Sequence, residues 1–183
     1  MRLFFAVTVD PAARAKIITG RPLENISSLR WVKPEQQHFT LCFLGEESPD
    51  RLPKIIAAGK SAAGRHQAFR IRLRETGFFP ERGDPRIFWV GVDQGASEIE
   101  RLAADLRAEL RLRSLGFDAR PFIPHLTLAR INGRLTGPDR ERLRGFSPGT
   151  ALLPVPGFRL LESRLAPDGA SYFELASFEL SEE

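Results

Sequence analysis

The chain has 183 residues, of which 42% are hydrophobic and 27% charged, and its formal net charge is +4. This balance excludes disorder driven by excess charge, and a single cysteine excludes a disulfide scaffold. No stretch approaches the roughly 20 apolar residues of a membrane helix, and the first residues lack the small-residue cleavage site of a signal peptide. We therefore expect a folded cytoplasmic protein with no membrane partner. Arginines far outnumber lysines, which is compatible with an anionic partner such as RNA.

The first half of the chain alternates strand-like and helix-like segments. An apolar run over residues 3–9 predicts a strand. Asp10 and Pro11 then supply an N-cap and an N1 proline for a helix that runs to about Ile18. The further elements expected in this half are a strand over 38–44, a helix over 50–63 and a strand over 69–79.

The second half repeats this order of elements. A strand over 86–92 precedes a helix whose apolar residues recur at the spacing of one buried face. We expect Ser97-Glu98-Ile99-Glu100 to form a capping box at the start of this helix and Gly116 to end it. The remaining elements are a strand over 123–131, a short helix over 138–144, a surface loop over 144–156, and closing strands over 158–165 and 172–180.

An internal repeat relates the two halves. A shift of 87 residues superimposes His38-Phe39-Thr40-Leu41 on His125-Leu126-Thr127-Leu128 without a gap. On either side of these segments the same shift superimposes Pro34 on Pro121 and residues 72–76 on residues 159–163. Matches before, within and after the histidine segment indicate a duplicated unit.

The repeat and the element order together predict the fold. Tight turns can join 69–79 to 86–92, and 158–165 to 172–180, as antiparallel hairpins. We expect an α+β protein with two antiparallel sheets facing a central cleft and helices on the outside. We also expect one bilobal domain over residues 1–183, with pseudo-symmetric lobes built around 38–41 and 125–128.

The two His-x-Thr segments predict a shared site. Residues i and i+2 of a strand face the same way, so His38 projects with Thr40 and His125 projects with Thr127. Two-fold pseudosymmetry would place the two pairs opposite each other across the cleft. The alternate residues, which are expected to point into the core and fix the register, are Phe39, Leu41, Leu126 and Leu128.

Two imidazoles and two hydroxyls suit displacement at phosphorus. The histidines can act as general base and general acid, and the hydroxyls can donate to non-bridging phosphate oxygens. Acyl transfer fits less well because no Ser or Cys nucleophile motif is present. With three histidines and one cysteine in the chain, we expect no metal site and no cofactor. Cys42 is expected to line the cleft beside His38, and we expect no role in catalysis for His66.

The two histidine segments resemble the signature motifs of the two-histidine (2H) phosphoesterase superfamily. Five further segments are similar to the RNA 2′,3′-cyclic phosphodiesterases of bacteria and archaea, formerly called 2′-5′ RNA ligases. The resemblance covers nearly the whole chain. These five segments are residues 1–6, 31–35, 43–46, 85–92 and 124–130.

The resemblance implies metal-independent hydrolysis of an RNA 2′,3′-cyclic phosphate end to a 2′-phosphate, with weak 2′-5′ RNA ligase activity. It implies that His38 is the proton donor and His125 the proton acceptor. The residues implied to hold the phosphate are Thr40, Thr127 and Arg130. Because Arg130 lies at an odd spacing from His125, it needs a β-bulge or a strand end to reach the cleft.

Two other functions stay open at this point. One is a non-catalytic RNA-end binding protein, although binding alone needs no titrating pair of histidines. The other is a sister 2H enzyme that acts on small cyclic nucleotides. Whichever function applies, we expect the protein to be a monomer.

Overall fold

The computed structural model describes residues 1–10, 25–147, 152–166 and 169–182, so most of the helix expected to run from Asp10 to about Ile18 lies outside the described residues. The strands are β1 (Arg2–Thr8), β2 (Leu29–Trp31), β3 (His38–Glu46), β4 (Phe69–Phe79), β5 (Ile87–Val92), β6 (His125–Ile131), β7 (Leu152–Val155), β8 (Gly157–Ala166) and β9 (Gly169–Glu179). The helices are α2 (Leu52–Ala63), α3 (Ala96–Leu112) and α4 (Gly137–Arg144), with 3-10 turns η1 (Pro34–Gln36) and η2 (Pro49–Arg51).

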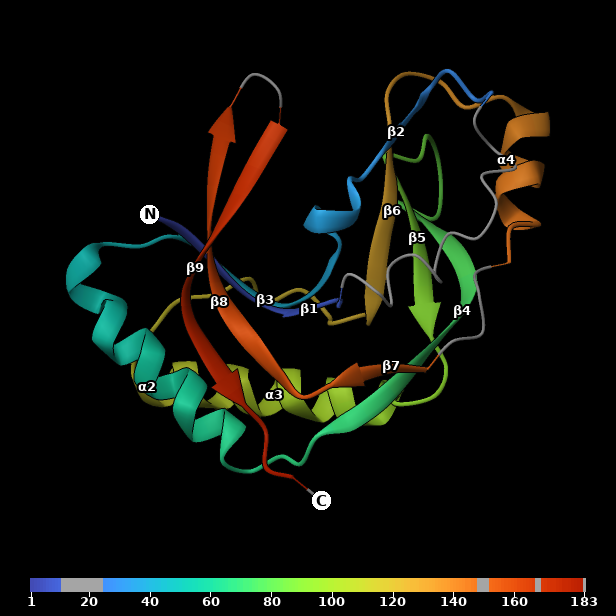
Figure 1. Ribbon diagram of the computed structural model, residues 1–183. Coiled ribbons are helices and arrows are strands. Elements are labelled where there is room, and N and C mark those ends of the chain that lie inside the picture. Colours follow the sequence, from blue (N-terminus) through green and yellow to red (C-terminus); the bar gives the residue numbers. More distant parts are fainter. Residues whose placement is uncertain (11–24, 148–151, 167–168, 183) are drawn as a thin grey trace.

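The strands form two antiparallel sheets (Figure 1). The four-stranded sheet has the order β3-β1-β8-β9, and the five-stranded sheet has the order β2-β6-β5-β4-β7. The hairpins β4–β5 and β8–β9 are both present, as the turns between them predict. The expected α+β class with two antiparallel sheets is therefore confirmed.

The two halves of the chain exchange equivalent strands. β4 belongs to the first half but pairs with β5, and β8, which the repeat superimposes on β4, belongs to the second half but pairs with β1. Each sheet therefore contains strands from both halves, and neither sheet can form from one half alone. The segments 72–76 and 159–163, which the repeat superimposes, lie in these exchanged strands.

Helices α2 and α3 lie side by side against the four-stranded sheet (Figure 1). The apolar face predicted for α3 is completely buried, and it joins the main hydrophobic core between the helices and the sheet. A second, smaller cluster lies on the opposite face of the same sheet and consists of Phe4, Ala6 and Leu161 with Phe43 and Tyr172 packed against them. The four-stranded sheet thus has one face on the helices and the other toward the site described below.

The predicted ends of α3 are wrong at both termini. The helix begins at Ala96, so Ser97 lies inside its first turn and forms no capping box. Gly95 is the N-cap residue with φ of 79°, and a Cβ there would lie 2.3 Å from the Arg70 carbonyl oxygen of β4. The close approach of β4 therefore fixes where the helix starts. The helix ends at Leu112, and Ser114, rather than Gly116, takes the left-handed conformation beyond it.

The expected loop over 144–156 also contains a strand. Within this stretch β7 pairs with the edge of β4 through residues 152–155, so the prediction of an unbroken loop is wrong. Leu153 and Val155 are buried and alternate with exposed residues, which is the pattern of an edge strand. Pro154 fits this position because an edge strand tolerates a residue without an amide hydrogen.

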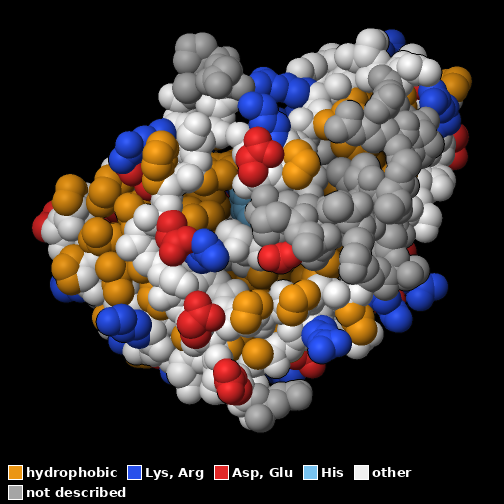
Figure 2. Space-filling view, in the orientation of Figure 1, with side chains coloured by type: hydrophobic (Ala, Val, Ile, Leu, Met, Phe, Trp, Pro, Cys, Tyr) orange, Lys and Arg blue, Asp and Glu red, His pale blue; other side chains and the backbone are white. Residues whose placement is uncertain are grey.

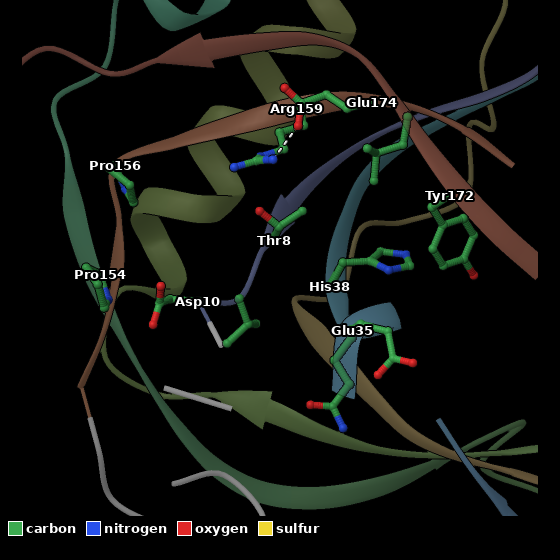
Figure 3. A pocket seen from close by; sticks show the side chains of 12 residues that line it. Thr8, Asp10, Glu35, His38, Pro154, Pro156, Arg159, Tyr172 and Glu174 are labelled. Atoms are coloured by element: carbon green, nitrogen blue, oxygen red, sulfur yellow. Dashed lines mark hydrogen bonds and ion pairs between the residues drawn. The ribbon is translucent and has the colours of Figure 1, made fainter. Parts of the chain in front are cut away.

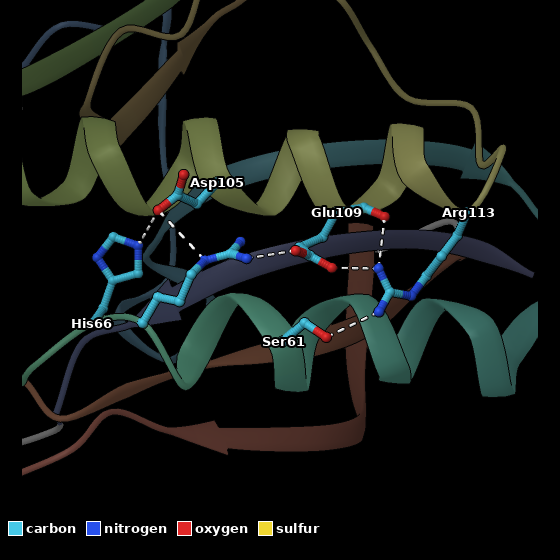
Figure 4. Close-up of polar contacts among 6 residues, drawn as sticks. Ser61, His66, Asp105, Glu109 and Arg113 are labelled. Carbon is cyan, nitrogen blue, oxygen red and sulfur yellow. Dashed lines mark hydrogen bonds and ion pairs between the residues drawn. The ribbon is translucent and has the colours of Figure 1, made fainter.

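A polar network joins α2 and the residues just after it to α3 (Figure 4). The buried Glu109 carboxylate accepts hydrogen bonds from Arg65 and Arg113, and Arg65 chiefly holds its pKa below the usual range. The Nε2 atom of His66 lies 2.9 Å from the carboxylate of Asp105, which is in α3 like Glu109. His66 therefore belongs to the contact between α3 and the residues that follow α2, and it does not line the cavity that contains the other two histidines.

Candidate active site

The two histidine segments open equivalent strands of the two sheets. β3 begins at His38 and β6 begins at His125, and both side chains are half-buried, as are Thr40 and Thr127. The residues between and after them, predicted to point into the core, are at most 1% exposed: Phe39, Leu41, Leu126 and Leu128. The predicted alternation therefore holds over both tetrapeptides.

Both strands then contain a β-bulge at the same position of the repeat. In β3, Thr40 pairs with Ala6 and Cys42 pairs with Phe5, which leaves Leu41 without a partner in the register. In β6, Thr127 pairs with Trp89 and Ala129 pairs with Phe88, which leaves Leu128 without one. An extra residue reverses the alternation of the side chains that follow.

The bulges decide which later side chains reach the cleft. In β3 the bulge turns Cys42 into the core, where it is 1% exposed, and brings Phe43 to the cleft. The prediction that Cys42 lines the cleft is therefore wrong, and burial raises the pKa of its thiol to about 11. In β6 the bulge brings Arg130 to the cleft beside His125, which is the geometry that its odd spacing requires.

One cavity of about 350 Å³ collects the five predicted site residues from the two sheets. We call it the central cleft; it is lined by His38, Thr40, His125, Thr127 and Arg130, with two further arginines, Arg2 and Arg120. Among the described residues that line it there is no carboxylate. A histidine side chain is visible in a hollow near the middle of the face shown in Figure 2. Arg2 and Arg130, together with Arg120, which pairs with Asp118 outside the lining, give the cleft a basic lining that suits a phosphate group.

Both imidazoles are held in the same way. The Nδ1 atom of His38 lies 2.7 Å from the Gln36 carbonyl oxygen, and that of His125 lies 2.7 Å from the Ile123 carbonyl oxygen. A carbonyl can only accept, so each Nδ1 carries the hydrogen and donates it. Each Nε2 is then the nitrogen that remains to take up or give a proton.

Aromatic rings fix the position of each imidazole. The ring centroid of His38 lies 5.0 Å from that of Phe4 and 5.1 Å from that of Tyr172. His125 lies 4.9 Å from Phe79 and 6.1 Å from Trp89. The Trp89 ring covers Gly77 on the neighbouring strand, where a Cβ would come within 2.2 Å of it. Only glycine at that position leaves room for the indole beside His125.

Burial keeps both histidines neutral in the empty site. The pKa of His38 is about 4, chiefly because of burial; the hydrogen bond to Gln36 acts in the opposite direction, and the nearby His125 and Arg130 contribute smaller lowering effects. Burial also lowers the pKa of His125. At neutral pH both Nε2 atoms therefore have a lone pair, and a nearby anion would raise both pKa values.

A second cavity, of about 530 Å³, opens beside His38 (Figure 3). His38 and Tyr172 line both cavities. The second cavity does not reach the site residues of β6, which line only the central cleft: His125, Thr127 and Arg130. Figure 3 shows these two shared side chains at one side of the second cavity, and Pro154 and Pro156 at the other. We call this second cavity the side cavity.

The sequence did not identify several residues of the central cleft. Arg2, Phe43, Arg120 and Tyr172 all line it, and the Arg2 guanidinium lies 5.1 Å from the centre of the Phe43 ring. Arg120 is oriented by an ion pair with Asp118. Nothing in the repeat marks Arg2, Arg120 and Tyr172, because they come from the far end of β1, the loop before β6 and the last hairpin, whereas the 87-residue shift superimposes Phe43 on Arg130.

Two of the other expectations concern a metal site and a membrane helix. In residues 1–10, 25–147, 152–166 and 169–182, no group of three or more His, Cys, Asp or Glu side chains is placed to hold a metal ion. No helix in that part of the chain is long and apolar enough to cross a membrane. Metal-independent catalysis stays a prediction.

Comparison with known proteins places the chain in a family. Residues 20–89 and 90–172 each match the family described as LigT like Phosphoesterase. The chain is 37% identical to the RNA 2′,3′-cyclic phosphodiesterase of Thermus thermophilus, over 98% of this chain and 90% of that protein, and 35% identical to that of Archaeoglobus fulgidus, over 98% and 100%.

Solved structures agree with these sequence matches. The crystal structure of TT0787 of Thermus thermophilus superimposes with a TM-score of 0.85 at 34% identity, over 100% of both chains. The structure of E. coli LigT complexed with 3′-AMP superimposes with a TM-score of 0.80 at 27% identity, over 98% of this chain and 97% of that one. Two consecutive matches to one family also agree with the internal repeat. The chain belongs to the LigT-like phosphoesterase family.

Proposed function

We propose that this enzyme hydrolyses the 2′,3′-cyclic phosphate at an RNA end to a 2′-phosphate, without a metal ion. The observation that carries the proposal is the composition of the central cleft. Two His-x-Thr pairs and three arginines line it, and no carboxylate does so among the described residues. The names of the relatives in Thermus thermophilus and Archaeoglobus fulgidus support the same substrate.

The reaction is an in-line displacement at phosphorus. Water attacks the phosphorus and gives a proton to Nε2 of His125, while the bond from phosphorus to O3′ breaks. His38 protonates O3′ through its Nε2, and the phosphate stays on O2′. His125 has gained a proton and His38 has lost one, so proton exchange with solvent returns both histidines to their starting states. The backbone acceptors at Gln36 and Ile123 leave both Nε2 atoms available for this exchange.

The remaining polar side chains of the cleft would hold the phosphate. The hydroxyls of Thr40 and Thr127 lie on the same strand faces as the two histidines and can donate to the non-bridging oxygens. Arg130 supplies positive charge from the His125 side. Charge that develops on the phosphate oxygens during attack is stabilised by donors already in place.

Protonation of His38 has to accompany substrate binding. Its pKa of about 4 in the empty site makes it neutral at pH 7, and a neutral imidazole with its hydrogen on Nδ1 cannot protonate O3′. The bound phosphate anion lies beside it and raises its pKa. We therefore propose that the substrate and the catalytic proton enter the site together.

The same geometry allows 2′-5′ joining. If the 5′-hydroxyl of a second RNA takes the place of water, the displacement of O3′ forms a 2′-5′ phosphodiester. Water is far more abundant than an RNA 5′-hydroxyl, so this ligase activity should be weak.

The test uses an oligoribonucleotide that ends in a 2′,3′-cyclic phosphate, with EDTA present. We expect the mass of one added water and a product phosphate that a 3′-specific phosphatase does not remove. Loss of turnover in EDTA that zinc or magnesium restores would overturn the metal-independent mechanism. Binding without turnover would support an RNA-end binding protein, and turnover of mononucleotides alone would support the sister enzyme.

A further inference from the structure

Gln36 connects His38 to a distant part of the chain. Its carbonyl oxygen accepts the hydrogen bond from Nδ1 of His38 at 2.7 Å, and its side-chain Nε2 donates to the Ala170 carbonyl oxygen, also at 2.7 Å. Both contacts belong to one residue, so the position of Ala170 and the orientation of the His38 ring are linked through Gln36. The Gln36 side chain is half-buried in the lining of the central cleft.

Ala170 lies in a part of the β8–β9 hairpin that no other strand supports. β8 pairs with β1 only through residues 159–162, so residues 163–166 and 169–172 form a two-stranded arm beyond the sheet (Figure 1). A two-stranded hairpin by itself is at best marginally stable, so contacts with the rest of the protein decide where the arm lies. The hydrogen bond from Gln36 is one of these contacts.

The other half of the repeat fixes the equivalent carbonyl group in another way. The 87-residue shift superimposes Gln36 on Ile123 and Gln37 on Pro124. The Ile123 carbonyl accepts from His125, but its side chain has no polar atom to form a second hydrogen bond. Pro124 restricts the backbone of the residue before it to extended conformations, which directs the Ile123 carbonyl. On the His38 side no proline stands at this position, and the hydrogen bond of the Gln36 side chain takes its place.

We infer that Gln36 is a positioning residue for His38: its hydrogen bond to the arm holds the carbonyl group that orients the imidazole for protonation of O3′. This inference rests on the proposed function. A general acid must lie within hydrogen-bond reach of the atom that it protonates, and a small misplacement lowers the rate. Without the bond to Ala170, the carbonyl group of Gln36 is free to turn, and Nε2 of His38 is no longer held toward the leaving oxygen.

The inference predicts a defect in one chemical step only. A positioning role affects the proton transfer from His38, so it should disappear when the leaving group needs no acid. A direct contact between Gln36 and the substrate, or a general disturbance of the cleft, would lower turnover with every leaving group. The leaving group therefore separates the positioning role from the other two.

The test compares two cyclic phosphates in the Gln36→Met variant, one with O3′ as the leaving atom and one with sulfur in its place. Methionine keeps the unbranched side chain and cannot donate to Ala170. We expect kcat to fall roughly 3–10-fold on the oxygen substrate, as for the loss of one hydrogen bond. On the sulfur substrate, whose thiolate leaves with little protonation, kcat should fall less than about twofold. Equal losses on both substrates, or no loss on the oxygen substrate, would overturn the inference.

Two further variants sharpen this result. When Gln36→Met is added to His38→Ala, kcat should fall less than about twofold further, because the residue that it positions is already absent. A further loss of roughly 3–10-fold would show that Gln36 acts elsewhere, against the inference. Gln67→Met is the matched control, since Gln67 is exposed and lines neither cavity, and its kcat should stay within about twofold of wild type on both substrates.

A measurement without turnover separates the inference from the proposed function. The exchange of the two imidazole Nδ1 protons with water is followed by NMR in the empty protein. In Gln36→Met the His38 proton should exchange at least about threefold faster than in wild type, and the His125 proton should keep its rate. An unchanged His38 rate would overturn the positioning by Gln36. If neither cyclic phosphate is hydrolysed while the His38 proton alone exchanges faster, the proposed function is wrong and the hold of Gln36 on His38 is confirmed.

Discussion

The strands that carry His38 and His125 share one backbone construction and differ in the side chains placed around it. Each strand starts at its histidine, donates Nδ1–H to a carbonyl two residues earlier, and contains a bulge three residues after the histidine. The residue brought to the cleft by the bulge is Phe43 in β3 and Arg130 in β6. The backbone around the two histidines is thus alike, while the side chains beyond the bulge differ.

The difference gives the two sides of the central cleft different environments. On the His38 side, Phe43 continues an apolar cluster with Phe4 and Tyr172, and burial lowers the pKa of His38 to about 4. On the His125 side, Arg130 adds a charge that can bind phosphate. Two nearly symmetric imidazoles can therefore take opposite roles, because their neighbours are not symmetric.

Removal of either histidine should give the largest loss. We expect His38→Ala and His125→Ala each to lower kcat on the RNA cyclic phosphate by roughly 10²–10⁴-fold, as is typical for loss of a general acid or base. His66→Ala is the control, because His66 lies in the α2–α3 network. Loss of activity in one of the two cleft variants alone would show that the lobes do not share the chemistry.

Removal of a threonine hydroxyl should have the next largest effect. Thr40→Val and Thr127→Val keep the shape and lose the donor, so kcat should fall roughly 10²-fold, as when one oxyanion donor is removed. The Ser variants at the same positions keep a hydroxyl and should recover most of the activity. If valine and serine give the same kcat, the hydroxyls do not hold the phosphate in the transition state.

Loss of the Arg130 charge should mainly weaken binding. Arg130→Ala should raise KM roughly 10-fold with a smaller change in kcat, since a charge-assisted hydrogen bond contributes about 1.5–3 kcal/mol. Arg134→Ala removes an exposed arginine of the same region that does not line the cleft, and its KM should stay within about twofold. Equal KM values for the two variants would contradict the role of Arg130.

The pH profiles should differ between the empty and the occupied site. Burial lowers both histidine pKa values in the empty site, and the bell-shaped kcat/KM profile reports that state, so its maximum should lie below pH 6.5. The phosphate anion raises both pKa values in the complex, so both limbs of the kcat profile should move to higher pH by about one unit or more. These values belong to the pair of histidines rather than to either one. If the limbs of the kcat profile lie at the same pH as those of the kcat/KM profile, or at a lower pH, proton uptake with the substrate is contradicted.

The bulges show what the sequence could and could not predict. The repeat identified both histidines and both threonines, because a two-residue alternation holds from each histidine to the bulge. The placement of Cys42 was wrong because that alternation was extended past Leu41. The odd spacing of Arg130 already required a bulge near Leu128, and the 87-residue shift carries that bulge to Leu41.

The exchange of β4 and β8 could not be predicted from the same patterns. Alternating burial says which face of a strand is covered, but not which sheet the strand joins. The acidic side cavity also depends on this exchange, because it combines Asp10 beyond β1 with Arg159 of β8 and Glu174 of β9. Residues this far apart in the chain meet only through the sheet order.

The division of the acid and base roles between His38 and His125 is tested most directly by changing the leaving group. In a cyclic phosphate whose bridging O3′ is replaced by sulfur, the leaving thiolate needs little protonation, so the acid is no longer required. On this substrate the loss of kcat in His38→Ala relative to wild type should be smaller by at least about 10²-fold than on the oxygen substrate. The loss of kcat in His125→Ala should be the same on both substrates. Equal recovery of both variants would contradict the account, and recovery of His125→Ala alone would reverse the two roles.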